Sequence, residues 1–517
     1  MDAPNAKVPG LKQRVSTAVR WFLASDRRLF VLALAGAIAY GASGYFYRVN
    51  WVDCGNRPSF STGLVSGITY LLALSLMTAA WLGFDVFRQR TSDGAAIHFS
   101  FRTSLIAALA VHLVVALVPP FLSQDTLAYG AIGSAMANHD QSMYMPLGMS
   151  LPAADPYAIK IAAHSAWLAH GSTYGPLFNY LAAAVVYVAG DNVTMALRLF
   201  QAVSLIAIFG AALFAADAAR TWQQKRLSEA GDVPNEADVA TRVLRLVLFC
   251  PLALIEATGN GHNDAILALF AAAAAWLIVK PRFGLALGVL IGAVLIKASA
   301  VFLPALFILH RLALRVRDHR TVILTGIGLG LCVVAAVWFG WPLIEHSAST
   351  IIRMIGTVDD IYPFCTRSLE CFPRALLHIV LDMPWASWSV GLVFRILGVG
   401  LLIVIAWRSA TAGTFLAAAA TFLLFYYLFL HAYMQAWYLL SLLVLLYFIG
   451  DRLMLVAKVF IISSLAQYAL DFSLACAKEP LWAGLREAIG FVIVLLPPSL
   501  VLARQFWFPP RSKQPNQ

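Results

Sequence analysis

The chain has 517 residues, of which 61% are hydrophobic and 12% are charged, and its mean hydropathy is +0.77. Soluble domains are about 45–50% apolar and about 25% charged, so this composition excludes an ordinary soluble protein. The net charge of +11 comes mainly from cations in short loops between apolar blocks, and no nucleic-acid-binding motif accompanies them. We therefore expect a membrane protein with no nucleic-acid partner.

Apolar blocks of nearly membrane-spanning length recur along the whole chain. Each one approaches the roughly 20 residues that are needed to cross about 30 Å of hydrocarbon. The blocks predict an all-α polytopic membrane protein with about 13–14 transmembrane helices. The clearest are 29–47, 64–86, 103–122, 193–217, 321–340, 411–430 and 488–503.

The distribution of cations predicts how the chain is oriented. The segment 1–28 carries six Lys and Arg residues and is expected in the cytoplasm, followed by a signal anchor and not by a cleaved signal peptide. The transmembrane domain is predicted at 29–505, with a cytoplasmic tail at 506–517. Its external loops are predicted at about 123–175 and 341–374, because these intervals lie between cationic loops.

One apolar block does not fit a simple alternation of crossings. The block 176–190 is short, opens with Gly175 and Pro176, and is one crossing too many for the loop charges on either side. We interpret it as a re-entrant or half-embedded helix, which is tolerated where protein or water covers its ends.

Ionisable and amide side chains at membrane depth are costly, so each one is a candidate for function. Asp125 follows an apolar block directly, in FLSQDTLAY. Partial desolvation there would raise the pKa of its carboxyl and suit it to act as a base. The alternative is that Asp125 is the N-cap of a helix over TLAYGAIGSAMA.

A second polar cluster, Asn260-Gly261-His262-Asn263-Asp264, lies between two long apolar runs. It is either a tight turn with Asp264 capping the next helix or part of a functional site. A turn alone does not need a histidine and two asparagines, and Glu256 shortly before it is a further polar residue in apolar surroundings. Lys297, within another apolar run, either snorkels to the interface or neutralises a phosphate.

Two further features leave alternatives open. The aromatic run around Trp437 and Tyr438 is typical of an interface belt, and equally of a wall on which a sugar stacks. Cys365 and Cys371 fall in one polar loop and either form a disulfide or remain free thiols. The chain has no Walker motif, HExxH or CxxC, so we expect no ATP-driven pump and no metal site of these types.

The motifs, taken in order, resemble those of GT-C glycosyltransferases that use polyprenyl-phosphate sugars, and in particular the actinobacterial α-1,6-mannosyltransferases. The resemblance covers roughly residues 100–440, and its short motifs are specific only in combination. They are Asp125-x-x-x-Tyr129-x-x-x-Gly133, Asp155-Pro156-Tyr157, Trp167, Tyr174-Gly175-Pro176-Leu177, Asn260-Gly261-His262-Asn263-Asp264-Ala265, Lys297 with Pro304, and Trp437-Tyr438.

The resemblance implies a GT-C-like bundle in a bacterial inner membrane, with the active site facing the periplasm. It implies that Asp125 is the catalytic base for transfer of mannose, or another hexose or pentose, to a glycan or lipid acceptor by direct displacement. It implies no obligatory cofactor, although acidic and histidine residues could hold a divalent metal ion. The residues implied in binding the donor phosphate or sugar are Tyr129, Tyr174, His262, Asn263, Asp264, Lys297, Arg353, Trp437 and Tyr438. The structural motif residues are Asp155, Pro156, Tyr157, Gly175, Pro176 and Asn260.

The chain departs from the family pattern at several positions, which leaves its sugar and acceptor open. Thr173 and Ala436 stand where relatives commonly have proline, Ser441 stands where an aromatic residue often follows, and His139–Pro146 is an insert. A lipid-linked sugar transporter or flippase is the competing prediction. Transporters usually place polar residues near the midplane within related repeats. In this chain the polar residues gather toward one face without an evident repeat, which favours an enzyme.

Overall fold

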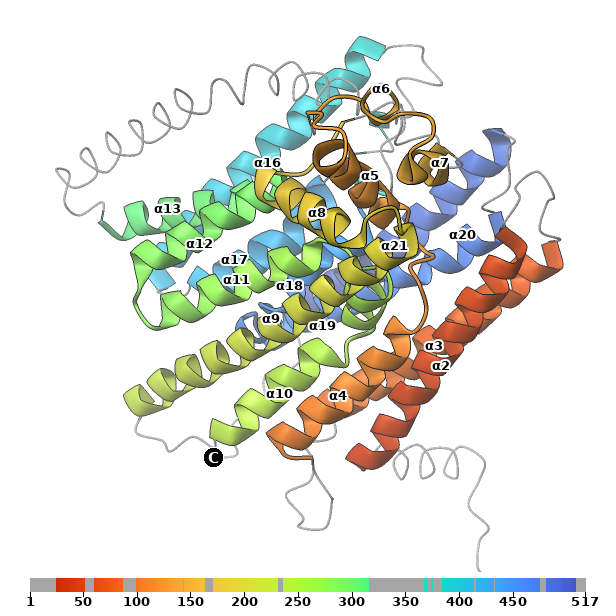
Figure 1. Ribbon diagram of the computed structural model, residues 1–517. Helices are drawn as coiled ribbons and strands as arrows, with labels where there is room; N and C mark the ends of the chain where they lie inside the picture. The colour runs from red at the N-terminus through yellow and green to blue at the C-terminus, as the bar shows by residue number, and fades with distance from the viewer. Residues whose placement is uncertain are drawn as a thin grey trace, which may run out of the picture.

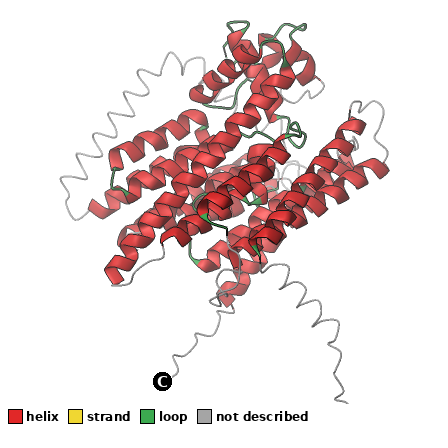
Figure 2. Ribbon diagram, turned by 60° about the horizontal axis from the view of Figure 1, so that its bottom comes forward, coloured by secondary structure: helices red, strands yellow, loops and turns green. Residues whose placement is uncertain are grey.

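The computed structural model describes residues 25–51, 60–86, 99–142, 144–162, 171–230, 236–315, 367–370, 373–374, 384–412, 415–431, 433–474 and 480–507. Figure 2 shows that these parts of the chain form helices joined by loops. Several of the helices are long and apolar enough to cross a membrane. The prediction of an all-α polytopic membrane protein is therefore confirmed.

The helices fall into four groups along the chain. The first group is α2 (Asp26–Trp51), α3 (Phe60–Val86) and α4 (Phe101–Ala116). The second is α5 (Asp125–Ala137), α6 (Leu147–Ser150), α7 (Pro156–Ala162) and α8 (Pro176–Ala189). The third is α9 (Val193–Ala230), α10 (Glu236–Leu248), the π-helix η3 (Ala253–Gly259), α11 (Asp264–Val279), α12 (Phe283–Ile296), the 3₁₀-helix η4 (Ala298–Val301) and α13 (Phe302–Arg315). The fourth is α16 (Pro384–Ala412), α17 (Phe415–Phe425), η6 (Tyr426–Leu430), η7 (Ala436–Leu439), α18 (Leu440–Leu443), η8 (Leu446–Phe448), α19 (Asp451–Ala466), α20 (Tyr468–Leu474) and α21 (Pro480–Trp507).

Seven segments of the described chain have the length and apolar composition of a membrane span. They are Asp26–Tyr47, Gly63–Asp85, Val193–Ser228, Ala298–Arg315, Ser389–Ser409, Asp451–Leu470 and Ala488–Phe506. An eighth is η3 with α11, if these two helices are counted as one span bent by 116°. Four shorter apolar helices are Phe101–Ala116, Pro176–Ala189, Phe283–Ile296 and Phe415–Leu430. The predicted total of about 13–14 stays a prediction, because 321–340 lies outside the described residues.

The short block after Gly175 forms helix α8, which has 14 residues and begins at Pro176. A helix of 14 residues is about 21 Å long, which is less than the hydrocarbon thickness of about 30 Å. Its length therefore fits a half-embedded helix better than a full crossing. The predicted external loops and the boundaries of the transmembrane domain stay predictions, and most of 341–374 lies outside the described residues.

Helix α9 is the central element, and it packs against α10 on one side and α11 on the other. Small residues let two helices in a membrane approach closely. Both helices carry buried alanines, among them Ala207 and Ala211 on α9 and Ala268 and Ala272 on α11, and Gly210 of α9 lies against the side chain of Leu269 of α11. Close packing of rigid helices holds the ends of α9 and α11 at fixed positions, and the polar residues lie near one of these ends.

Figure 1 shows α5, α6 and α7 at the upper end of the bundle, with α10 at the opposite, lower end. At the lower end, Arg245 of α10 pairs with Asp26 at 2.7 Å, and Asp85 binds both Arg242 and Lys458. Helix α4 runs from this end, where Ser104 accepts a hydrogen bond from Arg245, to the chain just before α5. The bundle therefore has one end tied by ion pairs and another where the helices break.

Candidate active site

Two acidic side chains stand at the first position of a helix at the upper end of the bundle. Asp125 begins α5 and Asp264 begins α11, and the residue before each one makes no side-chain cap. The interpretation of these carboxylates as N-caps is therefore wrong, because each lies inside the first turn and contacts other side chains. A carboxylate in the first turn is still stabilised by the helix dipole. Neither carboxylate caps its helix, so both can contact side chains of the site.

The turn from Asn260 to Asp264 joins η3 to α11 and reverses the chain direction sharply. Gln201 of α9 holds the end of η3 by donating to the carbonyl oxygens of Thr258 and Gly259 at 3.2 and 2.8 Å. Gly261 has a φ of +69°, which only glycine adopts without strain. Asn260 accepts from the Leu122 backbone N–H at 3.3 Å, which ties the turn to the chain before α5.

His262 lies at the centre of the candidate site and is fully buried. Its ring stacks on Trp437, with centroids 4.0 Å apart and planes 16° from parallel. Its Nδ1 lies 3.6 Å from Asp125 Oδ2, and its Nε2 lies 3.4 Å from Glu256 Oε2. The stacking fixes the plane of the imidazole, and each ring nitrogen lies near a carboxyl group, although Nε2 makes no hydrogen bond to the described residues.

Tyr129 of α5 joins the two acidic helix starts. Its hydroxyl donates to Asn263 Oδ1 at 3.3 Å and lies 3.5 Å from His262 Nδ1. The ring is fully buried and makes edge contacts with Tyr174 and Phe178, with centroids 5.1 and 4.8 Å apart. Tyr129 therefore couples α5 rigidly to the 260–264 turn.

Lys297 lies at the break between α12 and η4, where its backbone is extended. Its Nζ donates to Asp264 Oδ2 at 2.8 Å and lies 4.4 Å from the centroid of the Tyr438 ring. The side chain is 12% exposed. It is paired with a buried carboxylate, so the interpretation of Lys297 as a lysine that snorkels to the interface is wrong.

Tyr174 forms one wall of the site, and its hydroxyl donates to Asp125 Oδ2 at 3.4 Å. Gly175 after it presses on the end of α12: its N–H donates to the Ile296 carbonyl oxygen at 2.9 Å, and a Cβ at this position would lie 2.2 Å from the Leu295 oxygen. Pro176 then begins α8, a position where its missing N–H costs nothing. These contacts place Tyr174 beside Lys297.

The contacts of the Asp155-Pro156-Tyr157 motif stabilise the start of α7. Asp155 Oδ1 accepts from the backbone N–H groups of Tyr157 and Ala158 at 2.8 and 3.0 Å, which is the geometry of an N-cap on α7. Pro156 is the first residue of α7. The Tyr157 hydroxyl donates to the Gly190 carbonyl oxygen at 2.8 Å. The motif thus braces α7 against the end of α8.

The electrostatics of Asp125 differ from those of an ordinary aspartate. Helix α5 lies outside the segments that qualify as membrane spans. Burial raises the pKa of the Asp125 carboxyl to about 6, against the attraction of Lys297 and with added repulsion from Asp264; hydrogen bonds from Tyr174 and Ser123 limit the rise. A carboxylate with a pKa near the working pH is suited to take a proton in a reaction.

Asp155 shows the opposite behaviour. Its burial alone would raise the pKa of the carboxyl, but hydrogen bonds from His139, Ser134, Ala158 and Tyr157 outweigh it and hold that pKa below its ordinary value. His139 Nε2 lies 2.9 Å from Asp155 Oδ2, and this histidine comes from the insert 139–146. Asp155 therefore stays ionised as a structural anion.

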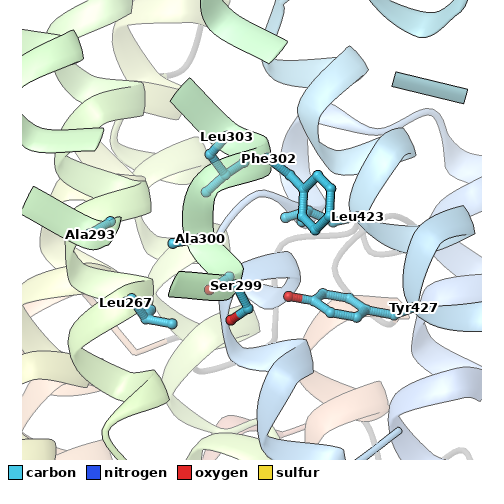
Figure 3. A pocket seen from close by; sticks show the side chains of 9 residues that line it. Leu267, Ala293, Ser299, Ala300, Phe302, Leu303, Leu423 and Tyr427 are labelled. Atoms are coloured by element: carbon cyan, nitrogen blue, oxygen red, sulfur yellow. The ribbon is translucent and has the colours of Figure 1, made fainter. Parts of the chain in front are cut away.

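An apolar crevice lies beside η4, the short helix that follows Lys297 along the chain (Figure 3). Ser299 and Ala300, which follow Lys297 along the chain, line it. Tyr427 lines it too and stacks on Tyr438, with centroids 6.0 Å apart and planes 15° from parallel. The interior of the crevice is about 10 Å³, about the space of one water molecule. Its lining is Leu267, Ala293, Ser299, Ala300, Phe302, Leu303, Leu423, Tyr427 and Ser441.

Four of the residues that the sequence singles out lie outside the described residues. Arg353 falls there, so its proposed contact with a phosphate stays a prediction, and Trp167 of the family motifs falls there too. Cys365 and Cys371 are the other two, and the choice between a disulfide and free thiols stays open. Within the described part of the chain, Cys250 is a buried free thiol.

Four polar residues that the sequence motifs did not assign support the site. Ser204 of α9 donates to the His262 carbonyl oxygen at 3.1 Å, beside the bonds that Gln201 makes to η3. Asn179 of α8 donates to the Tyr174 carbonyl oxygen at 3.2 Å. Glu256 contacts His262, and its only signal in the sequence is a carboxyl group within an apolar run. Serine and amide side chains in apolar helices are too common for sequence alone to single these residues out.

The fold and the site together define a polytopic membrane protein with two carboxylates, a histidine and a lysine gathered at the broken ends of its helices. The model of a family described as "Alpha-(1->6)-mannopyranosyltransferase, N-terminal domain" matches residues 30–313, which is more than half of the chain. The chain belongs to this family. The predicted resemblance to actinobacterial α-1,6-mannosyltransferases is therefore confirmed.

Two curated relatives are named Alpha-(1->6)-mannopyranosyltransferase A. The protein of Mycobacterium tuberculosis is 29% identical over 253 residues, which are 48% of this chain and 43% of the relative. The protein of Corynebacterium glutamicum is 24% identical over 272 residues, which are 51% of each chain. The chain thus spans about half the length of the curated relatives that it matches. No solved structure matches the chain.

Proposed function

We propose that this protein is a membrane-embedded mannosyltransferase. It takes mannose from a polyprenyl-phosphate donor and transfers it to a glycan or lipid acceptor on the periplasmic face of the bacterial inner membrane. The observation that carries the proposal is the convergence of Asp125, Lys297 and the 260–264 turn on one buried site. Membership in a family of mannopyranosyltransferases supports the reaction class and the sugar.

The proposed chemistry is a direct displacement. The Asp125 carboxylate takes the proton of an acceptor hydroxyl, and that oxygen attacks the anomeric carbon from the face opposite the lipid phosphate. The new C–O bond forms as the bond to the phosphate oxygen breaks, and the electron pair leaves with the phosphate. The protein supplies position and electrostatic stabilisation, without a covalent intermediate.

Lys297 is the group proposed to stabilise the departing phosphate. Ser299 and Ala300, which line the apolar crevice of Figure 3, follow Lys297 along the chain, so an isoprenoid chain attached to a phosphate at Lys297 would begin near apolar walls. Asp264 holds the lysine at 2.8 Å. A donor phosphate competes with this carboxylate for the same ammonium group.

The aromatic groups are proposed to hold the sugar and its surroundings. Trp437 is fixed by its stack on His262, and Tyr438 lies under Lys297. Together with Tyr174 they form an aromatic lining around the charged groups, with Tyr129 and Asn263 behind them. A rigid lining of this kind can orient a sugar ring for attack at one carbon.

The proposed orientation rests on the charge distribution. The cationic segment 1–28 precedes α2, whose first residue, Asp26, belongs to the end tied by ion pairs. Asp125 follows α4 at the other end. Cations favour the cytoplasm, so the candidate site is placed on the periplasmic side of a multi-pass inner-membrane protein.

We propose that transfer needs no metal ion. The leaving group is a lipid monophosphate, and the Lys297 ammonium supplies a positive charge for it. Transfer in the presence of excess EDTA should therefore proceed at the rate measured without it. A loss of activity with EDTA that Mg²⁺ or Mn²⁺ restores would overturn this part of the proposal.

The test is sugar transfer in proteoliposomes that contain polyprenyl-phosphate-[¹⁴C]mannose and an oligomannoside acceptor. The wild type should form labelled product, and Asp125→Asn should lower kcat about 100-fold or more, because the amide cannot take the proton. The matched control is Asp140→Asn, which changes an exposed aspartate of the same region. Equal transfer by wild type and Asp125→Asn would show that Asp125 is not the base. Movement of the intact donor across the bilayer without transfer would favour a flippase.

A further inference from the structure

Glu256 is a fully buried carboxyl group that the proposed displacement does not use. It lies in the π-helix η3, a type of local distortion that is frequent at functional sites. Asn260 donates to its Oε2 at 2.9 Å, and Asn260 is itself anchored by the Leu122 backbone N–H. The carboxyl group is therefore held at one orientation directly below the site.

The three groups Asp125, His262 and Glu256 form a continuous row. His262 Nδ1 lies 3.6 Å from Asp125 Oδ2, and His262 Nε2 lies 3.4 Å from Glu256 Oε2. The side chains of His262 and Glu256 are 0% exposed, whereas that of Asp125 is 14% exposed. The row thus leads from a partly open carboxylate into the closed interior of the protein.

Contacts on both the ring and the backbone hold His262 in place. Its face is stacked on Trp437, and the carbonyl oxygen of His262 accepts from Ser204. His262 Nε2 is buried without a hydrogen-bond partner among the described residues, and the Glu256 carboxyl group lies 3.4 Å from it; with the proton on Nε2, the Nδ1 lone pair faces Asp125 at 3.6 Å. A carboxylate that fixes the tautomer of a histidine in this way makes the other nitrogen a proton acceptor.

We infer that Glu256 and His262 form a proton relay behind Asp125, in which Glu256 is a positioning residue for His262. This inference rests on the proposed function, because it concerns the proton that Asp125 removes from the acceptor. A purely structural role for Glu256 would be satisfied by its contacts with Asn260 and Tyr468 alone, without a histidine aligned between two carboxylates.

The proton moves in two steps. The acceptor O–H bond breaks as Asp125 takes the proton, and the proton then passes from Asp125 to His262 Nδ1, which leaves Asp125 ionised again. His262 becomes an imidazolium whose charge is balanced by Glu256 through the Nε2–H. When the product leaves, the proton returns to Asp125, the member of the row that is open to solvent, and passes from there to water, so that Asp125 is ionised for the next transfer.

Other charged and titratable groups surround this row and define what a test must control. Lys297 and Asp264 face it from α12 and α11, and Tyr129 faces it from α5. Tyr174 reaches Asp125 from the chain before α8, and Tyr438 faces Lys297 from η7. Tyr468 of α20 faces Glu256. None of these groups lies between His262 and Glu256, so a change at Glu256 acts on the row first.

The test compares Glu256→Gln with the wild type in the proteoliposome assay over a range of pH. The glutamine keeps the size of the side chain and an oxygen for Asn260, but it cannot balance an imidazolium. We expect kcat to fall about tenfold or more, with the KM for the donor unchanged. The loss of kcat should be smaller at low pH, where a protonated Glu256 cannot balance the imidazolium in the wild type either.

The matched control is His112→Gln. His112 is also fully buried and contacts η3, through Thr258 Oγ1 at 2.6 Å, but it has no contact with Asp125. It should keep the wild-type kcat and pH–rate profile. Glu256→Asp, which keeps the carboxylate, should keep the shape of the wild-type pH–rate profile even with a lower kcat.

Two results would overturn the relay while leaving the proposed function intact. One is a Glu256→Gln enzyme with the kcat and pH profile of the wild type, in an assay where Asp125→Asn is inactive. The other is an equal loss of kcat in Glu256→Gln and His112→Gln. If Glu256→Gln does not fold, His262→Gln replaces it, with the same expected kcat loss and the same outcomes. Absence of transfer by the wild type would instead overturn the proposed function, and the relay with it.

Discussion

Asp125 is suited to act as a base because burial disfavours its negative charge and only a few contacts offset this effect. Lys297 attracts a negative charge on Asp125, but the lysine is already bound to Asp264. The Tyr174 hydroxyl reaches Asp125 only at 3.4 Å. These contacts stabilise the ionised carboxylate enough for it to form near neutral pH. They are too weak to lower its pKa to the ordinary aspartate value, so the carboxylate keeps its affinity for a proton.

The first prediction concerns pH. Because burial raises the pKa of Asp125 to about 6, the carboxylate form that accepts a proton is lost as the pH falls through that value. The transfer rate should rise about tenfold per unit from about pH 4 toward pH 6 and level off above it. A pH–rate profile measured under kcat/KM conditions checks this, and a rate that is flat across this interval would contradict it.

The second prediction concerns Lys297. Lys297→Met removes the ammonium group from the donor phosphate and should raise the donor KM about tenfold or more, since a charge-assisted hydrogen bond contributes about 1.5–3 kcal/mol. Lys297→Arg keeps the charge and should retain more of the affinity. The matched control is Lys160→Met, an exposed lysine of α7. A donor KM equal to that of the wild type in Lys297→Met would remove the lysine from phosphate binding.

At the scale of elements, the site is built where helices break. Helices α5 and α11 begin with its two acids, η3 ends just before the turn, and α12 ends one residue before Lys297. Backbone groups at helix ends are left without partners inside the helix, and side chains such as Gln201 satisfy them. Broken helices at membrane depth are tolerated only where protein or a water-filled cavity covers them.

The third prediction tests the closest of these junctions. Gly175→Ala places a methyl group 2.2 Å from the Leu295 carbonyl oxygen, so α8 and α12 must separate. We expect a lower thermal midpoint, which corresponds to about 2 kcal/mol, and a lower kcat because Tyr174 moves with its neighbour. Gly288→Ala on α12 has nothing within 4 Å and should leave both quantities unchanged. Wild-type stability and kcat for Gly175→Ala would show that α8 and α12 can separate at this junction without a cost in free energy.

At the scale of the whole molecule, two groups of charged side chains lie at opposite ends of the described bundle and serve different purposes. The lower end holds complete ion pairs, such as Arg245 with Asp26, whose side chains are nearly buried. The upper end holds the two acids Asp125 and Asp264 and the lysine Lys297, which is bound to Asp264. Helix α4, about 24 Å long, separates the ends, so the two groups of charges act independently.

The fourth prediction follows from this separation. Asp85 is the common partner of Lys458 and Arg242, and Asp85→Ala leaves the nearly buried Lys458 without its carboxylate. We expect a loss of about 3–5 kcal/mol in stability, measured as a fall in thermal midpoint in detergent. The acid limb of the pH–rate profile should stay at its wild-type position. A shifted limb would show that the two ends are coupled.

Much of the site's membership can be predicted from the sequence, because polar residues are conspicuous in apolar surroundings. Asp125, His262, Asp264 and Lys297 all stand out for this reason, and the fold brings them together. Their partners cannot be predicted in the same way. The choice between helix cap and site for Asp125, and between snorkelling and pairing for Lys297, depends on contacts between residues far apart in the chain.

The sequence by itself determined that the chain resides in a membrane, that it is helical, and which family it belongs to. These properties depend on composition, on the length of apolar blocks and on short motifs, all of which are local. Only the tertiary structure decided that Lys297 pairs with Asp264 and that His262 lies between Asp125 and Glu256. The packing of α9 and α11 through small residues sets these distances, because each polar group is carried on a helix end whose position other helices fix.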